Sequence, residues 1–349
     1  METFFAIGLM SGTSLDGLDL CYVRFERENG TWNFEILETS TLPYSEKWEQ
    51  KLKNSIHISA EELLELHSEY GFYLGEKTNA FIAEKNISKV DVIASHGHTV
   101  FHQPHKKFST QIGDGRAIKI IAKLPVVYDF RTQDVLMGGN GAPLVPIGDE
   151  LLFSEYDGCI NLGGFSNISL KRDGKRIAFD ICPVNIVLNK IAKNFGKKYD
   201  ENGELSKSGT IIPELLSKLD ELEFYAKDHP RSLGIEWVNE HFSPLIQHEN
   251  LTDVLATCNQ HFANQIASTI EKFGLKNVLI TGGGSYNTFL IETIQTQTSA
   301  QIIIPENTIV EFKEALIFAF MGVLKILGEN NVLASATGSS EDHSSGLIA

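Results

Sequence analysis

The chain has 349 residues, of which 42% are hydrophobic, and it carries a formal net charge of −15. This length exceeds the usual size of a single hydrophobic core, so we expect two domains of ordinary size. A globally acidic chain repels phosphates, which argues against an extended nucleic-acid or anionic-membrane surface. Any anionic ligand must therefore be held locally, by turn N–H groups, helix N-termini, a bound cation or a few Arg and Lys side chains.

The cysteines and the apolar segments indicate the cellular compartment in which the protein is expected. Four cysteines stand far apart in the sequence and form no CxxC pair: Cys21, Cys159, Cys182 and Cys258. This spacing favours reduced thiols over a disulfide framework. The N-terminus lacks the basic region and cleavage site of a signal peptide, and the apolar run 315–324 is shorter than the ~20 residues that span a bilayer. We therefore expect a cytoplasmic protein.

The opening stretch, AIGLMSGTSLDGLD at residues 6–19, predicts a tight turn between two strand-like apolar runs. Its glycines let the backbone approach an anion and adopt positive φ, and its hydroxyl and N–H groups form an anion nest. Leu18 stands where a P-loop needs its Lys, so a Walker-type ATPase is disfavoured. The candidate phosphate-binding residues are Ser11, Gly12, Thr13, Ser14, Leu15, Asp16 and Gly17. Asp16 also offers a carboxylate to a hydrated metal ion. An ordinary Ser/Gly-rich hairpin is the alternative.

The rest of the first half alternates strand and helix signals. Residues 31–44 predict a third strand, and a capping box at Ser59 and Glu62 predicts a long helix to residue 86. Residues 90–94 and 123–128 predict short buried strands that deliver the loops SHGHTVFHQPH and DFRTQD, and loops at such strand ends commonly line sites. The glycine-rich stretch 138–146 is the predicted crossing between lobes.

The second half opens by repeating the plan of the first, with strand-like runs around a turn at Gly163 and Gly164. Two such hairpins suggest duplicated lobes that grip a nucleotide, with chance similarity as the competitor. Further on we predict an amphipathic helix over 252–273, a strand over 277–281, a glycine turn, and a C-terminal segment that is a flexible tail or a surface loop. The nucleotide candidates here are Gly163, Gly164, Gly282, Gly283, Gly284 and Asn287; a plain tight turn is the alternative for the glycine run.

These elements predict an α/β protein of two lobes with mixed sheets. We place the first lobe at residues 1–135, joined by the C-terminal segment 330–349, and the second at residues 136–329.

Four places carry candidate chemistry. Asp180 is the preferred general base, because a helix N-terminus after it would keep the carboxylate ionised; capping that helix is its alternative role. The histidines of residues 96–105 sit beside small polar residues suited to a polyhydroxylated ligand, with a zinc site as the alternative. Arg131 can clamp a carboxylate or phosphate, or pair with Asp134. Glu314 begins a buried helix, and it can also hydrogen-bond sugar hydroxyls.

With these residues in view, the chain resembles the anhydro-N-acetylmuramic acid kinases, within the hexokinase, actin and Hsp70 superfamily of two-lobed ATP-binding proteins. The resemblance spans nearly the full length. The matching strings are GLMSGTSLDGLD (8–19), SHGHTVFH (95–102), QIGD (111–114), DFR (129–131), GGNGAPLVP (138–146), NLGGFSNI (161–168), SLGIEW (232–237), GGG (282–284) with Asn287, and EA (314–315).

The resemblance implies a fold of two actin-like, or ribonuclease H-like, lobes with the active site in the cleft between them. It implies ATP-dependent phosphorylation of 1,6-anhydro-N-acetylmuramic acid with hydrolytic opening of the anhydro bridge, giving N-acetylmuramic acid 6-phosphate in cell-wall recycling. Asp180 matches the family's catalytic aspartate. ATP and Mg²⁺ are implied at the glycine turns, with Asp16 on the metal. The sugar is implied to face His96, Gly97, Thr99, Arg131 and Glu314, and a homodimer is left open.

The sequence departs from the family pattern at two places. The usual TGPGN after the catalytic aspartate reads ICPVN here at residues 181–185, and His98 replaces the usual Gln. Val184 lacks the backbone freedom of glycine, which puts close phosphate approach in question. Two alternatives follow, a kinase for another anhydro-sugar and a catalytically weak nucleotide-binding module of the same fold.

Overall fold

The computed structural model describes residues 1–12, 15–227, 231–248 and 250–349. The chain folds as two compact units, unit 1 (Met1–Phe153 and Phe312–Ala349) and unit 2 (Ser154–Glu311). The sequence placed residues 136–153 and 312–329 in the second lobe, whereas they belong to unit 1. The physical reason is visible in α12 (Asn307–Ile326), because Ala315 and Ala319 of this helix pack directly on Gly8 of unit 1.

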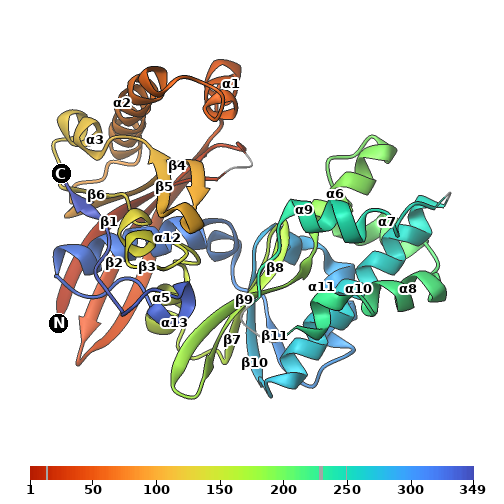
Figure 1. Cartoon of the computed structure of the whole chain (residues 1–349). Helices are drawn as coiled ribbons and strands as arrows, with labels where there is room; N and C mark the ends of the chain where they lie inside the picture. Colours follow the sequence, from red (N-terminus) through yellow and green to blue (C-terminus); the bar gives the residue numbers. More distant parts are fainter. Residues whose placement is uncertain (13–14, 228–230, 249) are drawn as a thin grey trace. The chain divides into compact units, whose positions relative to one another are not determined.

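Unit 1 is built on a seven-stranded mixed sheet (Figure 1). Its strands are β1 (Glu2–Ser11), β2 (Leu18–Glu28), β3 (Thr31–Leu42), β4 (Val92–Gln103), β5 (Phe108–Ile112), β6 (Val126–Tyr128) and β12 (Leu347–Ile348). The first three form an antiparallel meander in which β1 and β2 pair and β2 and β3 pair. β4 then runs parallel to β1, and β6 runs parallel to β4. The order along the sheet is therefore β12-β6-β4-β1-β2-β3, with β5 paired to β4.

Helices cover both faces of this sheet. The helices of unit 1 are α1 (Glu46–Asn54), α2 (Ala60–Glu84), α3 (Gly115–Ala122), α4 (Thr132–Leu136), α5 (Pro146–Leu151), most of α12 and α13 (Ala334–Thr337), with a 3₁₀ turn at Pro104–Lys106. Alternate residues of β1 point to opposite faces. Ile7 and Leu9 join a buried cluster with Tyr70 and Leu74 of α2, whereas Gly8 faces α12.

Unit 2 repeats the same strand topology in a five-stranded sheet. Its strands are β7 (Gly158–Leu162), β8 (Phe165–Arg172), β9 (Lys175–Pro183), β10 (Asn277–Thr281) and β11 (Gln301–Ile303). β7, β8 and β9 form an antiparallel meander, and β10 and β11 add in parallel beside β7. Three antiparallel strands followed by two parallel ones is the ribonuclease H-like order, so the predicted duplication of lobes is confirmed.

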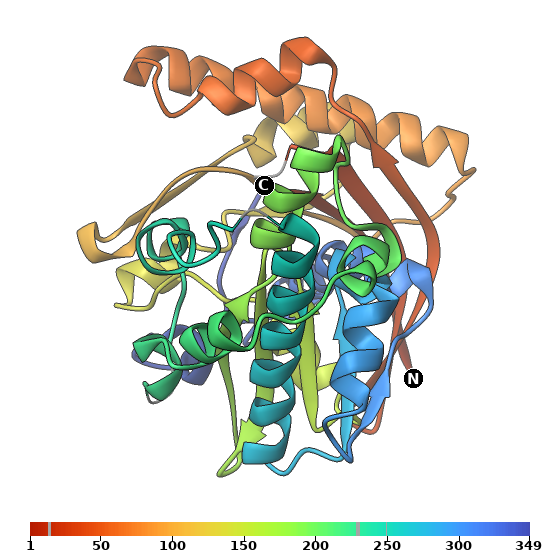
Figure 2. The same ribbon diagram turned by 90° about the vertical axis from the view of Figure 1, so that its right-hand side faces the viewer.

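A long helix, α10 (Leu251–Lys272), carries much of the core of unit 2. Figure 2 shows it, coloured teal, running along the green strands. The other helices are α6 (Asn185–Ala192), α7 (Glu204–Ser208), α8 (Pro213–Asp220), α9 (Ile235–Trp237) and α11 (Thr288–Gln295), with short 3₁₀ turns at Lys193–Phe195, Glu201–Gly203, Glu223–Ala226 and Gly283–Tyr286 and a π turn at Val238–Phe242. Leu255, Phe262 and Ile266 of α10 are fully buried against Ile168 and Ile181 of the sheet.

Several elements were predicted correctly from local sequence patterns. The capping box at Ser59 and Glu62 starts α2, with both hydrogen bonds present. The predicted amphipathic helix over 252–273 is α10. All four cysteines are buried, and Cys182 packs in the core of unit 2.

Two local predictions were wrong. The histidine-rich segment does not form a loop, because β4 continues to Gln103 and pairs with β5. Of the two alternatives for the C-terminal segment, the flexible tail is wrong, because Asn331 and Ser345 are fully buried and hydrogen-bond each other, and β12 pairs with β6. Among the described residues, no helix is long and apolar enough to cross a membrane.

The close approach of β1 to α12 generates a prediction. A Cβ at Gly8 would overlap the carbonyl oxygen of Ala315, which is backbone and cannot move aside. We expect Gly8→Ala to destabilise the protein by about 2–3 kcal/mol, the upper part of the range for overpacking. The matched control is Gly164→Ala, whose Cβ would lie 3.8 Å from the nearest atom. Thermal unfolding checks this, and equal melting temperatures for the two variants would contradict it.

Candidate active site

Asp180 lies on β9, beside an irregularity in the strand pairing. Asn167 of β8 pairs with Asp180 and Ser166 pairs with Cys182, so Ile181 is an extra residue in β9. Such a β-bulge re-aims the neighbouring side chain and is common next to active sites. The carboxylate of Asp180 accepts hydrogen bonds from the backbone N–H of Leu233 at 2.7 Å and from the hydroxyl of Ser232 at 3.3 Å.

The environment of Asp180 adjusts its acidity. Burial raises the pKa of the carboxyl above its ordinary value, while the hydrogen bonds from Leu233 and Ser232 and the nearby charge of Arg231 pull the pKa down. A base whose pKa is moved toward neutrality is a stronger proton acceptor than an exposed aspartate. Asp180 is therefore suited to take a proton.

The helix N-terminus does not play the part expected for it. The helix after β9, α6, begins at Asn185, and its N-cap residue is Val184, which makes no side-chain cap. The alternative that Asp180 caps this helix is therefore wrong. The partners that hold the carboxylate come instead from residues about 50 positions later in the chain.

The turn at Gly163 and Gly164 is tied to the divergent ICPVN segment. The carbonyl of Gly164 accepts from the N–H groups of Val184 at 2.9 Å and Ile186 at 3.1 Å, and that of Gly163 accepts from Asn185 at 3.3 Å. These three N–H groups are thus engaged within the protein. Val184 is fully buried with φ of −137°, so no left-handed conformation is required where the family has glycine.

A pocket of about 400 Å³ opens in unit 2 beside the predicted glycine run. Its lining includes Asn185, Leu188, Asn189, Tyr199, Asp200, Glu201, Asn202, Gly283, Gly284, Tyr286 and Asn287. The volume lies in the ordinary range of small-molecule sites. A Cβ at Gly283 would meet nothing within 4 Å, and Gly282 has φ of 83°, where glycine is favoured. The pocket therefore combines amide side chains, two tyrosine rings and an open glycine surface.

Three of the predicted sugar residues, His96, Gly97 and Arg131, form one cluster in unit 1. The Nε of Arg131 donates to Nε2 of His96 at 3.0 Å, and its Nη1 donates to the carbonyl of Gly141 at 2.6 Å. Arg131 does not hydrogen-bond to Asp134, the ion-pair partner that the sequence offered for it. The carboxylate of Asp134 instead accepts from the N–H of Gly141 and the hydroxyl of Thr337. Arg131 is thus aimed by β4 and by the glycine loop that follows α4.

The same cluster fixes the protonation state of His96. Its Nδ1 lies 2.9 Å from the carbonyl of Gly97, an acceptor, so Nδ1 carries the proton. Nε2 accepts from Arg131 and must be unprotonated. Burial and then the charge of Arg131 lower the pKa of His96 well below its ordinary value. The register between β1 and β4 shifts between Leu9 and Ser11, which places His96 and Gly97 in a bulge.

Glu314 lies close to this cluster, but not at the start of its helix. α12 begins at Asn307, so Glu314 is about two turns inside it, beyond the reach of the N-terminal dipole. The side chain is exposed, yet surrounding protein raises the pKa of its carboxyl, while Arg131 lowers it. Thr99 lies apart from this group in the hydrogen-bond pattern, since its hydroxyl accepts from Gln111 at 3.3 Å.

The phosphate-loop candidates follow β1. Leu15 takes the left-handed conformation with φ of 61°, and a Cβ at Gly17 would lie 2.7 Å from the carbonyl oxygen of Leu42. Asp16 is exposed, as a metal ligand in contact with solvent requires. Thr13 and Ser14 lie outside the described residues.

Ser11 is engaged more deeply than the sequence indicated. Its side chain is buried, and its hydroxyl accepts from Tyr44 at 2.8 Å and lies 3.1 Å from Nδ1 of His98. Tyr44 in turn lies 2.6 Å from the hydroxyl of Tyr70. Burial lowers the pKa of His98 to about 4, so the ring beside Ser11 is neutral at neutral pH. Ser11 therefore anchors the loop through its side chain.

The zinc alternative finds no support in the geometry. Within the part of the chain that the structure describes, no group of three or more His, Cys, Asp or Glu side chains is arranged to hold a metal ion. His102 bonds instead to the hydroxyl of Ser109 at 3.1 Å.

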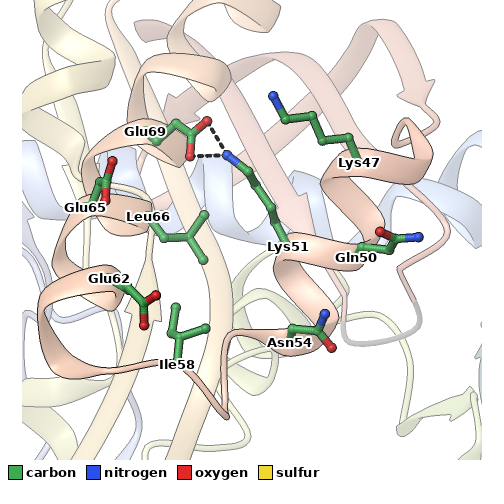
Figure 3. Close-up of a pocket in the computed structure, with 9 residues that line it drawn as sticks. All are labelled: Lys47, Gln50, Lys51, Asn54, Ile58, Glu62, Glu65, Leu66 and Glu69. Atoms are coloured by element: carbon green, nitrogen blue, oxygen red, sulfur yellow. Dashed lines mark hydrogen bonds and ion pairs between the residues drawn. The ribbon is translucent and has the colours of Figure 1, made fainter.

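A second pocket, of about 390 Å³, lies between α1 and α2 (Figure 3). Charged side chains line it, and Lys51 pairs with both carboxylate oxygens of Glu69 at 2.5 Å. None of the predicted site residues lines this pocket. It is separate from the candidate site.

Sequence reasoning missed the residues that hold Asp180. Ser232 stands in a string that matched the family, but the Leu233 contact is made by backbone N–H and has no side-chain signal. Tyr44 was likewise missed, because a tyrosine at the end of a strand is ordinary in a core.

Two ribonuclease H-like units in one chain define the actin-like class of proteins. Solved structures of similar fold include component A of (R)-2-hydroxyglutaryl-CoA dehydratase from Acidaminococcus fermentans, with a TM-score of 0.49 and 13% identity over 93% of this chain and 99% of that one. Another is a ROK family glucokinase from Streptomyces griseus in complex with glucose and AMPPNP, with a TM-score of 0.42 and 12% identity over 91% and 99%.

The chain belongs to the anhydro-N-acetylmuramic acid kinase family, whose model matches residues 4–349. Curated relatives that carry this name include the protein of Aliivibrio fischeri, 32% identical over 98% of both chains. Another is the protein of Bacillus thuringiensis, 31% identical over 92% of both chains. The chain is accordingly an enzyme of an ATP-using kinase family.

The tautomer of His96 generates a testable statement. We expect His96 to stay neutral, with its proton on Nδ1, between pH 8 and pH 5, because burial and Arg131 lower its pKa well below 6.5. Nuclear magnetic resonance of imidazole-labelled protein measures this, with His96→Gln for assignment. Replacing Arg131 by Met removes a cause of the depression, so the pKa of His96 should rise. A His96 signal that titrates near 6.5 in the unmodified protein contradicts the arrangement.

Proposed function

We propose that this chain phosphorylates 1,6-anhydro-N-acetylmuramic acid and hydrolytically opens its anhydro bridge. Water attacks the anomeric carbon, the bond from C1 to O6 breaks, and O6 takes the γ-phosphoryl group of ATP as ADP leaves. The product is N-acetylmuramic acid 6-phosphate, which places the reaction in the recycling of cell-wall sugars. The family membership of the whole chain supports the proposal, and Asp180 carries it at the level of residues.

Asp180 would act as the general base that takes a proton from the attacking water. Its carboxylate is held by two donors and has a pKa raised by burial, so it is both oriented and more basic than an exposed aspartate. The donors from Ser232 and Leu233 leave its other oxygen, Oδ1, to meet the water. The attack then needs no hydroxide from solution.

The nucleotide would be held by unit 2 and by the loop after β1. The pocket beside Gly283 and Gly284 has a volume and a set of amide side chains that suit the adenosine part of ATP. Asn287 lines the same pocket, although its Oδ1 already caps α11 by accepting from Leu290. The turn at residues 11–17 would hold phosphates through backbone N–H groups, because the Ser11 hydroxyl is engaged elsewhere.

The sugar would be bound by the cluster of unit 1. Arg131 is held rigidly by His96 and Gly141, and its pKa, lowered to about 10 by burial, leaves it protonated at neutral pH. A fixed guanidinium suits the carboxylate that an N-acetylmuramic acid carries. Glu314 would accept hydrogen bonds from sugar hydroxyls, and Gly97 and Thr99 complete the proposed set.

Magnesium fits the residues present. Mg²⁺ keeps several waters and is commonly bound by one or two carboxylates together with substrate phosphates. The exposed carboxylate of Asp16 meets that requirement without a cage of protein ligands. When bound, the ion supplies positive charge against the phosphates of ATP.

The setting and the alternatives are also part of the proposal. The wide spacing of the four cysteines in the sequence suits a reducing, cytoplasmic compartment, where ATP is available. A homodimer stays a prediction. A kinase for another anhydro-sugar shares the chemistry, so levoglucosan is the comparison substrate. A nucleotide-binding module with weak catalysis is the other alternative, motivated by ICPVN.

Substitution of the proposed base tests the function. We expect Asp180→Asn to lower kcat by about 10²–10⁴-fold, because an amide cannot accept the proton of water. The dissociation constant for ATP should stay within about two-fold. The carboxylate of Asp180 hydrogen-bonds to Ser232 and Leu233, and neither residue lines the proposed nucleotide pocket. Release of ADP, coupled to addition of the anhydro-sugar, measures kcat, and calorimetry measures ATP binding.

The matched control is Asp173→Asn, which makes the same change at an exposed hairpin turn before β9. Wild-type turnover by Asp180→Asn would contradict the role of Asp180. ADP release only with open-ring sugars would contradict the bridge-opening reaction, and no sugar-dependent ADP release at all would favour the binding module.

A further inference from the structure

We infer that a buried relay of Asp220, His261 and Tyr225 in unit 2 positions the catalytic carboxylate of Asp180. The relay does so through the segment 231–233, so these are positioning residues. The inference deepens the proposed function and rests on it.

The relay is a chain of hydrogen bonds across three elements. Nδ1 of His261, on α10, lies 2.5 Å from Oδ1 of Asp220 at the end of α8. Nε2 of the same ring lies 2.9 Å from the hydroxyl of Tyr225, in the turn Glu223–Ala226. His261 is fully buried and lies on the side of α10 that faces the core of unit 2.

The proton positions in the relay are determined by its partners. Burial lowers the pKa of His261, and although Asp220 raises it, the net shift is downward, so the ring is neutral. Burial raises the pKa of Tyr225 well above its ordinary value, so the phenol keeps its proton. Tyr225 therefore donates to Nε2, and Nδ1 donates to Asp220. Asn264 and Gln265 add donors to Asp220 at 2.9 and 3.1 Å and hold its carboxylate in place.

Arg231 connects the relay to the catalytic strand. Its Nη1 donates to the carbonyls of Phe224 at 3.2 Å and Tyr225 at 3.0 Å, and its guanidinium lies 4.7 Å from the ring centroid of Phe224. Its Nε donates to the carbonyl of Asp180 at 3.2 Å, and the N–H of Asp180 donates back to the carbonyl of Arg231 at 3.0 Å. One side chain thus grips both the turn that Tyr225 anchors and the backbone of Asp180.

The next two residues complete the connection. Ser232 and Leu233 supply the donors to Oδ2 of Asp180. A displacement of the turn at Tyr225 moves Arg231, and with it both of these donors. Loss of hydrogen bonds to a carboxylate favours its protonated form and raises its pKa. The relay therefore controls both the orientation and the acidity of the base.

The test is Tyr225→Phe, which removes the hydroxyl and keeps the ring under Arg231 and Trp237. We expect kcat to fall about ten-fold, with the dissociation constant for ATP unchanged. The acid limb of the pH profile of kcat should move to higher pH, because Asp180 must be ionised to act. Asp220→Asn, which keeps an acceptor oxygen for His261, should lose less activity than Asp220→Ala.

The matched control is Tyr22→Phe, which deletes a hydroxyl that donates to the carbonyl of Lys89 at 2.8 Å in unit 1. A kcat for Tyr225→Phe that matches wild type, or that falls no more than the control, overturns the inference, as does an unshifted acid limb. Asp180→Asn, measured alongside, separates the two failures. If it retains turnover, the proposed function fails; if it is inactive while Tyr225→Phe is unaffected, only the relay fails.

Discussion

The proposed chemistry depends on one side chain, Asp180, whose carboxylate must be largely buried from water and still be ionised. Removing Asp180 from water raises the pKa of its carboxyl, and donors that hydrogen-bond to the ionised form compensate by lowering that pKa. The N–H of Leu233 and the hydroxyl of Ser232 supply that compensation. Their positions depend on a segment far along the chain, so the chemistry of β9 is set by tertiary structure as much as by its own sequence.

The two units meet a common problem with a common device. Each sheet follows the ribonuclease H-like order, and each has a one-residue irregularity in strand pairing beside a candidate site residue. The bulge in β4 places His96 and Gly97, and the bulge in β9 lies next to Asp180. A regular strand would alternate these side chains strictly between two faces, so the irregularity frees one residue from the packing pattern. In unit 1 the freed residue, His96, then fixes Arg131.

How much of this the sequence could predict varied with the kind of interaction. Periodicity and capping gave α2 and α10, and the repeated hairpins gave the duplicated topology, because these are local patterns. The motifs gave the family and named Asp180, Arg131 and Glu314 as candidates. The sequence predicted a loop at His96 and His98, whereas both lie in β4. The strand continues because β4 pairs with β5, and the residues of β4 alone do not reveal that pairing. The Leu233 N–H and the neutral state of His96 have no local signal at all, since they arise from contacts between distant segments.

The pKa of the Asp180 carboxyl in the folded protein shows whether this side chain is both buried and held by its donors. Carbon-13 resonance of selectively labelled aspartate carboxyls, assigned by comparison with Asp180→Asn, follows its titration. We expect a titration midpoint clearly above the ordinary aspartate value of about 3.9 and a further rise when Ser232 is replaced by Ala. A midpoint at or below that ordinary value, unmoved by the Ser232 change, would contradict it.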